Sequence, residues 1–288
     1  MGDKLKTMQN IEDIPSRVDH ERYYSAIGVA DFIAAHHDEE GTYNVNEHWG
    51  HEGEIYRAIC VWVLLDAYKF SDKPEYLDKS RIILERFRKR QRPSGGWTLS
   101  LGSDGLKFKV TDDERRDTET LEDPVISGAV LKSIADYQLI TGTKDFQDMG
   151  NKAFDYLMDL WNSDIGTINE YRDRHLSALR SNPDSYHFMI LLGLNAWSDA
   201  GSSKAKEVLP QNIDFARKTF DNFDDKTMPL MVGYYVAVLT KFCSLEYSKR
   251  YIKPKLDAYM KSGLFGSNDI PGGYGHHDGL RGIVTDEL

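Results

Sequence analysis

The sequence predicts an all-α fold built from helical hairpins, and three observations support this prediction. Helices that are apolar on nearly every face alternate along the chain with amphipathic helices that carry many charges. A helix that is hydrophobic all round is expected to be buried, whereas an amphipathic helix lies at the surface. Segments with the two-residue alternation of a β-strand are almost absent. The chain of 288 residues is also long enough to bury a sizeable core in one large domain.

The elements follow in order from these patterns. Residues 1–18 are expected to form an N-terminal arm, and residues 19–288 a single domain that begins with a helix over residues 21–37. After a loop at residues 38–53, apolar helices are predicted at residues 54–70, 125–140, 186–197 and 229–242. Each is followed by an amphipathic helix, at residues 75–92, 145–161, 204–223 and 246–261.

The connections between these helices differ in length. The turn from an apolar to an amphipathic helix is short, whereas the return is often long and carries a glycine signature. The instances are Gly41-Thr-Tyr43, Gly95-Gly-Trp97, Gly166-Thr-Ile168 and Gly272-Gly-Tyr274. The last one leads into a plausible fifth inner element at the C-terminus. Repeats of this size indicate stacked supersecondary units, and if the alternation closes on itself the result is an α/α toroid. An open solenoid fits less well, because its repeats would be more uniform in length.

One motif carries a resemblance to known proteins. Gln91, followed by Gly95-Gly-Trp97, a polar loop and a helix, resembles the Gln…Gly-Gly-Trp element of the α/α-toroid proteins. That group includes six-hairpin glycosidases, polysaccharide lyases, uronate epimerases, and squalene and terpene cyclases. The resemblance in architecture covers most of the chain and matches no single family. It implies a toroid of about five hairpins with inner and outer helix rings.

Charge and composition exclude several classes of function. A net charge of −10 argues against a nucleic-acid binder and against a polybasic membrane-surface protein. The N-terminal residues lack the apolar run of a signal peptide, and no apolar run is long enough to span a bilayer, so we expect a cytoplasmic protein. Cys60 and Cys243 both lie in apolar runs and are expected to be buried thiols. Phosphate-binding glycine loops, serine nucleophile elbows and Cys-x-x-Cys pairs are absent from the sequence.

The toroid places the expected ligand site at one end of the inner helices. Their N-termini would converge on the face that carries the long loops, and each presents about half a positive charge. Such a mouth suits an anionic or oxygen-rich ligand. The expected substrate-binding residues are loop aromatics and arginines: Tyr43, Trp49, Trp97, Arg172, Arg174, Tyr274 and Arg281. The alternative for the aromatic residues, Trp97 above all, is that they are wedges packed between hairpins.

Four clusters supply the expected catalytic residues: the first contains His48, the second Glu119 and Asp123, the third Tyr186 and His187, and the fourth His277 and Asp278. Paired carboxylates such as Glu119 and Asp123 serve as general acid and base or bind a divalent cation, the one cofactor considered. Their alternative role is helix capping. Histidine beside a carboxylate is a proton-transfer pair, and its alternative is a solvated loop residue.

These features lead to three hypotheses for the function. The first is a carbohydrate-active enzyme, either a glycoside hydrolase or a polysaccharide lyase or epimerase, that acts on an oligo- or polysaccharide. If the substrate carries uronates, arginine would bind the acidic group. The second is an isoprenoid cyclase, which requires a deep chamber walled by aromatic residues of the inner helices: Trp62, Tyr68, Tyr186, Tyr234 and Tyr235. The third is a toroid that acts only as a binding scaffold, in which none of the four clusters would converge.

Overall fold

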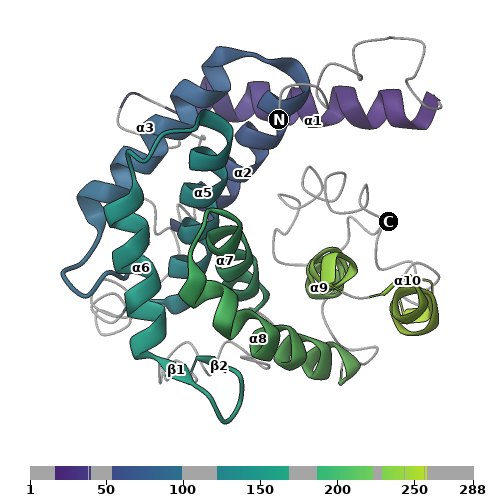
Figure 1. Cartoon of the computed structure of the whole chain (residues 1–288). Coiled ribbons are helices and arrows are strands. Elements are labelled where there is room, and N and C mark those ends of the chain that lie inside the picture. The colour runs from purple at the N-terminus through teal and green to yellow at the C-terminus, as the bar shows by residue number, and fades with distance from the viewer. Residues whose placement is uncertain are drawn as a thin grey trace, which may run out of the picture.

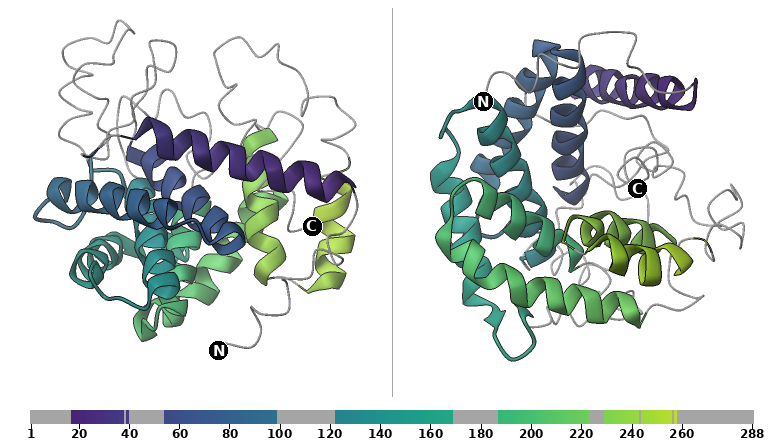
Figure 2. Two further views of the ribbon diagram at one scale, coloured as in Figure 1. Left: turned by 90° about the horizontal axis from the view of Figure 1, so that it is seen from above. Right: turned by 45° about the vertical axis from the view of Figure 1, so that its right-hand side comes forward.

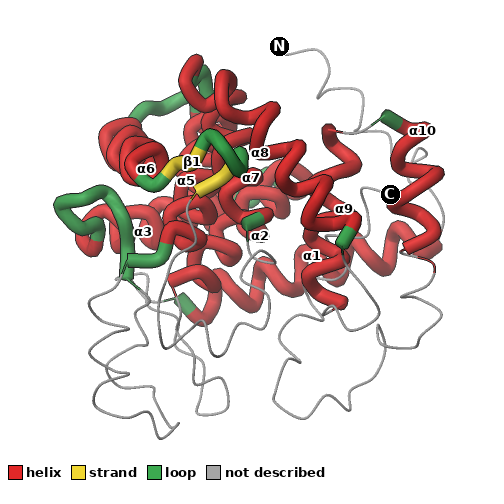
Figure 3. Tube along the Cα trace, turned by 90° about the horizontal axis from the view of Figure 1, so that it is seen from below, coloured by secondary structure: helices red, strands yellow, loops and turns green. Residues whose placement is uncertain are grey.

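The computed structural model confirms that the protein is all-α. It describes residues 17–37, 39, 54–98, 122–168, 187–222, 229–242, 244–255 and 257. Of the described residues, 79% are helical and 4% are in strands. Figure 3 shows that the described elements are helices apart from one short pair of strands.

The helices occur close to where the apolar and amphipathic patterns predict them. The bounds are α1 Arg17–His36, α2 Glu54–Ser71, α3 Pro74–Arg90, α5 Pro124–Thr141, α6 Gln147–Asp159, α7 Phe188–Asp199, α8 Ser203–Asp221 and α9 Pro229–Phe242. The last predicted amphipathic helix is different, because it begins as a single turn, α10 Leu245–Tyr247, and continues as a π-helix, η4 Ser248–Ile252.

The described helices form two layers along an arc (Figure 1; Figure 2, right). The apolar helices α2, α5, α7 and α9 pack against one another in that order on the inner side. The amphipathic helices α3, α6 and α8 each pack on the preceding apolar helix and lie along the outer side. α5 is buried over most of its length, whereas α6 buries only one face. The predicted division into buried and surface helices is therefore confirmed for these three hairpins.

Close backbone contact joins two of the inner helices. α5 and α7 cross at Gly128 and Gly193, where a Cβ added to Gly193 would lie 2.3 Å from the Gly128 carbonyl oxygen. A Cβ on Gly128 would lie 2.8 Å from the Ile190 Cα. These contacts join the first half of α5 to the first half of α7. Glycine is therefore required at the crossing because any side chain would strike a backbone.

Side-chain hydrogen bonds join α2 to α5 and α1 to α3. The Trp62 indole N–H of α2 donates to the Ser133 hydroxyl of α5 at 2.9 Å, and Trp62 is 8% exposed. On α1, Asp31 accepts from the Tyr76 hydroxyl at 2.5 Å and from the Lys73 ammonium at 2.8 Å. The hydrogen bond from Lys73, followed by that from Tyr76, holds the pKa of Asp31 below its usual value.

The segment with the Gly-Gly-Trp motif is held along α6. The Gln91 side-chain amide donates to the Gly95 carbonyl at 2.9 Å and to the Met149 carbonyl at 3.0 Å. Gly95 has a φ of 101°, and a Cβ there would lie 2.1 Å from the Lys152 carbonyl oxygen. The motif is therefore a tight turn with close backbone packing, which explains both the glutamine and the glycine.

The Gly166 signature lies in a small hairpin that the sequence did not predict. Strand β1, Trp161–Asn162, pairs antiparallel with β2, Thr167–Ile168. Gly166 adopts a φ of 75°, and its carbonyl accepts from the Asn212 side chain of α8 at 3.1 Å. Strands of two residues are too short to show a two-residue alternation, so this pair could not be predicted from the periodicity of the sequence.

The described helices include no candidate membrane span. None of them combines the length and the apolarity that crossing a bilayer requires.

Candidate functional site

Three of the predicted site residues lie in the described part of the chain: Trp97, Asp123 and His187. The others lie outside the described residues, and their predictions stay predictions. They are Tyr43, His48, Trp49, Glu119, Arg172, Arg174, Tyr186, Tyr274, His277, Asp278 and Arg281.

Buried ionisable side chains are concentrated at the N-terminal ends of the inner helices. Glu54 and Arg57 lie in the first turn of α2, and Asp123 is the N-cap of α5. His187 occupies the N-cap position of α7. Within the described residues, these are the only Asp, Glu, Lys or Arg side chains in the buried class, and His37 is the only other buried histidine. Three successive inner helices thus begin with a buried group that can carry charge or transfer a proton.

An ion pair anchors the start of α2 to the end of α3. One Glu54 carboxylate oxygen lies 3.1 Å from the Arg57 guanidinium, and the other lies 2.7 Å from Arg90 Nε in the last turn of α3. Glu54 and Arg57 are 1% and 2% exposed. A charge is expensive to bury unless it is paired, so this pairing is what permits a carboxylate at the position. Sequence reasoning missed both residues, because a first-turn glutamate is ordinarily explained by the helix dipole.

Asp123 has the capping role that the sequence offered as the alternative to catalysis. Its Oδ1 accepts from the Val125 backbone N–H at 2.8 Å, and Pro124 occupies the first helical turn. Beside it, Glu122 accepts from the Ser94 hydroxyl at 2.6 Å. The Asp123 carboxylate therefore caps α5, and the Glu122 carboxylate joins the Gly-Gly-Trp turn to the start of that helix.

Backbone contacts also bring together the described residues on either side of residues 99–121. Thr98 and Glu122 form an antiparallel bridge, and the Asp123 N–H donates to the Trp97 carbonyl at 2.8 Å. The predicted catalytic residue Glu119 belongs to this segment and lies outside the described residues.

His187 is packed between the start of α7 and the outer helix α8. Its ring meets the Phe215 ring edge-on, with centroids 5.2 Å apart, and the residue is 7% exposed. Its backbone carbonyl accepts the N–H groups of Ile190 and Leu191 in the first turn of α7. The position suits a proton-transfer group in a shielded environment.

The Trp97 side chain is buried in the core. Its indole N–H donates to the Phe87 carbonyl at 2.8 Å, and its ring meets the Phe87 ring edge-on at 6.0 Å. With 1% of its surface exposed, the indole offers no open face on which a sugar ring could stack. Trp97 therefore has the alternative role given above, that of an aromatic residue packed as a wedge and not exposed to a ligand.

The aromatic residues proposed to wall an isoprenoid chamber are instead held in helix interfaces where they are described. Trp62 is bound to α5 as described above, and Tyr235 is 0% exposed with its ring 5.8 Å from that of Phe188. Tyr68 is partly buried against the core. Side chains filling interfaces do not line a cavity, so these residues do not favour the cyclase hypothesis.

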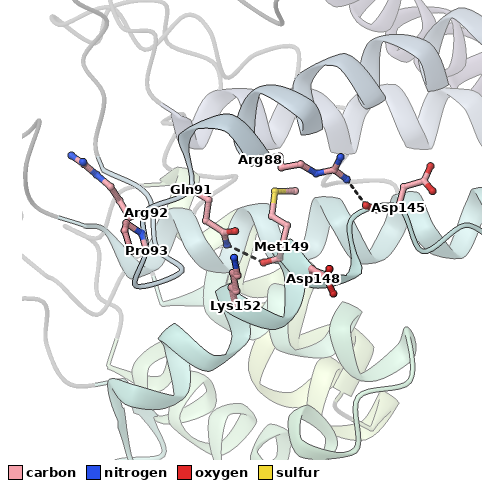
Figure 4. Close-up of a pocket in the computed structure, with 8 residues that line it drawn as sticks. All are labelled: Arg88, Gln91, Arg92, Pro93, Asp145, Asp148, Met149 and Lys152. Carbon is pink, nitrogen blue, oxygen red and sulfur yellow. Dashed lines mark hydrogen bonds between the residues drawn. The ribbon is translucent and has the colours of Figure 1, made fainter.

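A polar groove lies on the outer layer, between the end of α3 and the start of α6 (Figure 4). It has a volume of about 510 Å³ and is lined by Arg88, Gln91, Arg92, Pro93, Asp145, Asp148, Met149 and Lys152. Arg88 lies over the Phe146 ring and donates to the Asp145 carbonyl. Arg92 extends away from the other lining side chains. The cations and carboxylates of the groove do not converge on one point, so it offers no clear charge selectivity.

Metal and thiol chemistry find little support in the part of the chain that the structure describes. It contains no group of three or more His, Cys, Asp or Glu side chains placed to hold a metal ion. Burial raises the pKa of the Cys60 thiol to about 12, so this cysteine stays protonated at neutral pH and is a poor nucleophile. Cys243 lies outside the described residues.

Comparisons of the chain with protein-family models, with curated proteins and with solved structures gave no match. The functional argument therefore depends on the geometry of the chain itself.

Proposed function

We propose that the protein is a carbohydrate-active enzyme, that its hairpins close into an α/α toroid, and that its catalytic basin lies at the N-terminal ends of the inner helices. The observation that carries the proposal is the placement of Glu54, Arg57, Asp123 and His187 at the starts of α2, α5 and α7. Buried ionisable groups are costly in a structural role and are concentrated at functional sites. Their position on three successive inner helices supports a common basin.

The contacts between inner helices support the same geometry. Gly128, near the start of α5, packs against Met189 and Ile190 in the first turn of α7, so the close crossing keeps these two helix starts near each other. Helix N-termini brought together in this way create a region that favours negative charge and oxygen-rich groups. An oligosaccharide, and a uronate in particular, has these properties.

In the proposed mechanism His187 transfers a proton and a carboxylate assists. Histidine and carboxylates are the usual groups in general acid–base chemistry on sugars. Arg90 is 39% exposed and is held by Glu54, so it is placed to bind a substrate carboxylate at the edge of the basin. The predicted residues Glu119, His277 and Asp278 would complete the site from outside the described residues.

The test is a screen of acidic and neutral polysaccharides with two readouts. Absorbance of an unsaturated product reports elimination, and new reducing ends without that absorbance report hydrolysis. His187→Asn should lower turnover by about a hundredfold or more, the range seen when a proton-transfer group is removed. Glu54→Gln should lower turnover as well, because Arg90 would lose the carboxylate that holds it.

Glu246→Gln is the matched control for Glu54→Gln, because Glu246 is an exposed carboxylate on α10 and its loss should leave turnover unchanged. Circular dichroism melts must show that both site variants remain folded. The proposal fails if no glycan is turned over, or if folded His187→Asn and Glu54→Gln keep the activity of the unmodified protein.

A further inference from the structure

At the far end of the arc from α2, α8 lies beside α10 and η4 (Figure 1; Figure 2, right). Two tyrosines and two arginines of these elements contact one another there. We name the four residues Arg217, Tyr247, Tyr251 and Arg250 the tyrosine–arginine ladder. The Arg217 guanidinium lies 4.5 Å from the Tyr247 ring centroid. The Tyr247 and Tyr251 centroids are 5.0 Å apart, and the Arg250 guanidinium lies 5.3 Å from the Tyr251 centroid.

Half of the ladder, Arg250 and Tyr251, lies in a rare backbone conformation and is exposed. Tyr251 and Arg250 belong to the π-helix η4, a conformation that occurs mostly as single turns and frequently at functional sites. Tyr251 is 44% exposed although its ring contacts that of Tyr247, and Leu245 on the same segment is 69% exposed. Exposed tyrosine and arginine together are the residue types that dominate binding energy at protein interfaces.

The charge of the ladder is uneven from one end to the other. At the α8 end, Arg217 lies 3.7 Å from Asp214, and Asp221 accepts from the Tyr247 hydroxyl at 3.4 Å. At the η4 end, Lys249 and Arg250 are exposed and form no ion pair within the described part of the chain. Among the described residues, these two cations are therefore unpaired, although the chain as a whole carries a net charge of −10.

The contacts within the ladder limit which groups this surface can offer to a ligand. A guanidinium that lies against a ring keeps its N–H donors in its own plane, where they bind carboxylates in a forked geometry. Each tyrosine ring already has another ring and a guanidinium against it. Both rings are thus already in contact with a ring and a cation, which leaves less of their surface for a nucleotide base or a sugar.

We infer that the tyrosine–arginine ladder is a docking surface for an acidic peptide segment of a partner protein. Carboxylates of the segment would pair with Arg250 and Lys249, and an apolar side chain of the segment would cover the exposed edge of Tyr251. Recognition of acidic motifs by arginine clusters is an established mode of peptide binding. This inference does not depend on the proposed enzymatic function.

The experiment measures fluorescence anisotropy of a labelled peptide of glutamates with interspersed leucines, titrated with the full chain. Arg250→Gln should weaken binding about tenfold through the loss of a charged hot-spot contact. Arg250→Lys keeps the charge and removes the planar fork, so it should recover only part of the affinity. Tyr251→Ala should weaken binding as well, because the apolar contact and the support for Arg250 are lost.

Lys204→Gln is the matched control, since Lys204 is an exposed cation at the other end of α8 and its loss changes the net charge equally. The control should bind the peptide as the unmodified chain does. The inference is overturned if the peptide does not bind, or if Lys204→Gln weakens binding as much as Arg250→Gln. It is also overturned if heparin or single-stranded DNA competes for the ladder while the acidic peptide does not.

Discussion

Replacing Gly193 with alanine tests the packing of the inner helices most directly. The added Cβ would lie 2.3 Å from the Gly128 carbonyl oxygen and 3.0 Å from its carbonyl carbon. Ordinary van der Waals contact begins near 3.4 Å, so α5 and α7 would have to separate. A backbone carbonyl cannot rotate away as a side chain can, and the strain therefore acts on both helices.

The expected magnitude follows from two opposing effects. Alanine in place of a helical glycine stabilises a helix by about 1 kcal/mol. Overpacking a close contact costs about 1–3 kcal/mol, and a clash with backbone belongs at the upper end or above it. We expect Gly193→Ala to lower the free energy of unfolding by about 2 kcal/mol, which corresponds to a fall in Tm of roughly 4–8 °C for a chain of this size.

Urea unfolding and a thermal melt measure this change, and α1 provides the control. Gly28 is an exposed helical glycine whose added Cβ would have nothing within 4 Å. Gly28→Ala should therefore leave stability unchanged or raise it by up to about 1 kcal/mol. The reasoning about the crossing is refuted if Gly193→Ala is as stable as the unmodified chain or more stable.

Three further predictions concern single side chains. Asp123→Ala should cost about 1 kcal/mol through loss of the cap of α5, whereas Asp123→Asn should keep most of that stability in the same urea assay. The pKa of Asp31 is held below its usual 3.8 first by the hydrogen bond from Lys73, so its contribution to stability is present above that value and is lost as the pH falls through the lower folded pKa. Asp31→Asn should therefore flatten the decline in stability below about pH 4, and an unchanged pH profile would contradict this. In a Cys243→Ser background, the partly buried Cys60 should react much more slowly with a thiol reagent at pH 8 in the native protein than after unfolding, and equal rates in the two states would contradict this.

Functional residues were harder to predict from the sequence than helices. Asp123 was recognised at the head of an inner helix, but its role as a cap depends on the Val125 N–H that the structure places against it. The sequence predicts Trp97 as either a substrate-binding aromatic or a wedge between hairpins, and only the packing of α3 shows that its ring contacts Phe87, whose carbonyl accepts the indole N–H. Glu54 was not singled out, because its burial depends on Arg90, which is far away in the chain.

The all-α class and the division into buried and surface helices can be predicted from local sequence patterns. The physical reason is that helical periodicity is a local property, so an apolar α5 and an amphipathic α6 can be recognised without knowing what they contact. The tertiary structure alone decided which polar groups are buried, where α5 and α7 touch, and where the backbone leaves the α-helical pattern in η4. These features arise from contacts between residues distant in the chain, which no local pattern encodes.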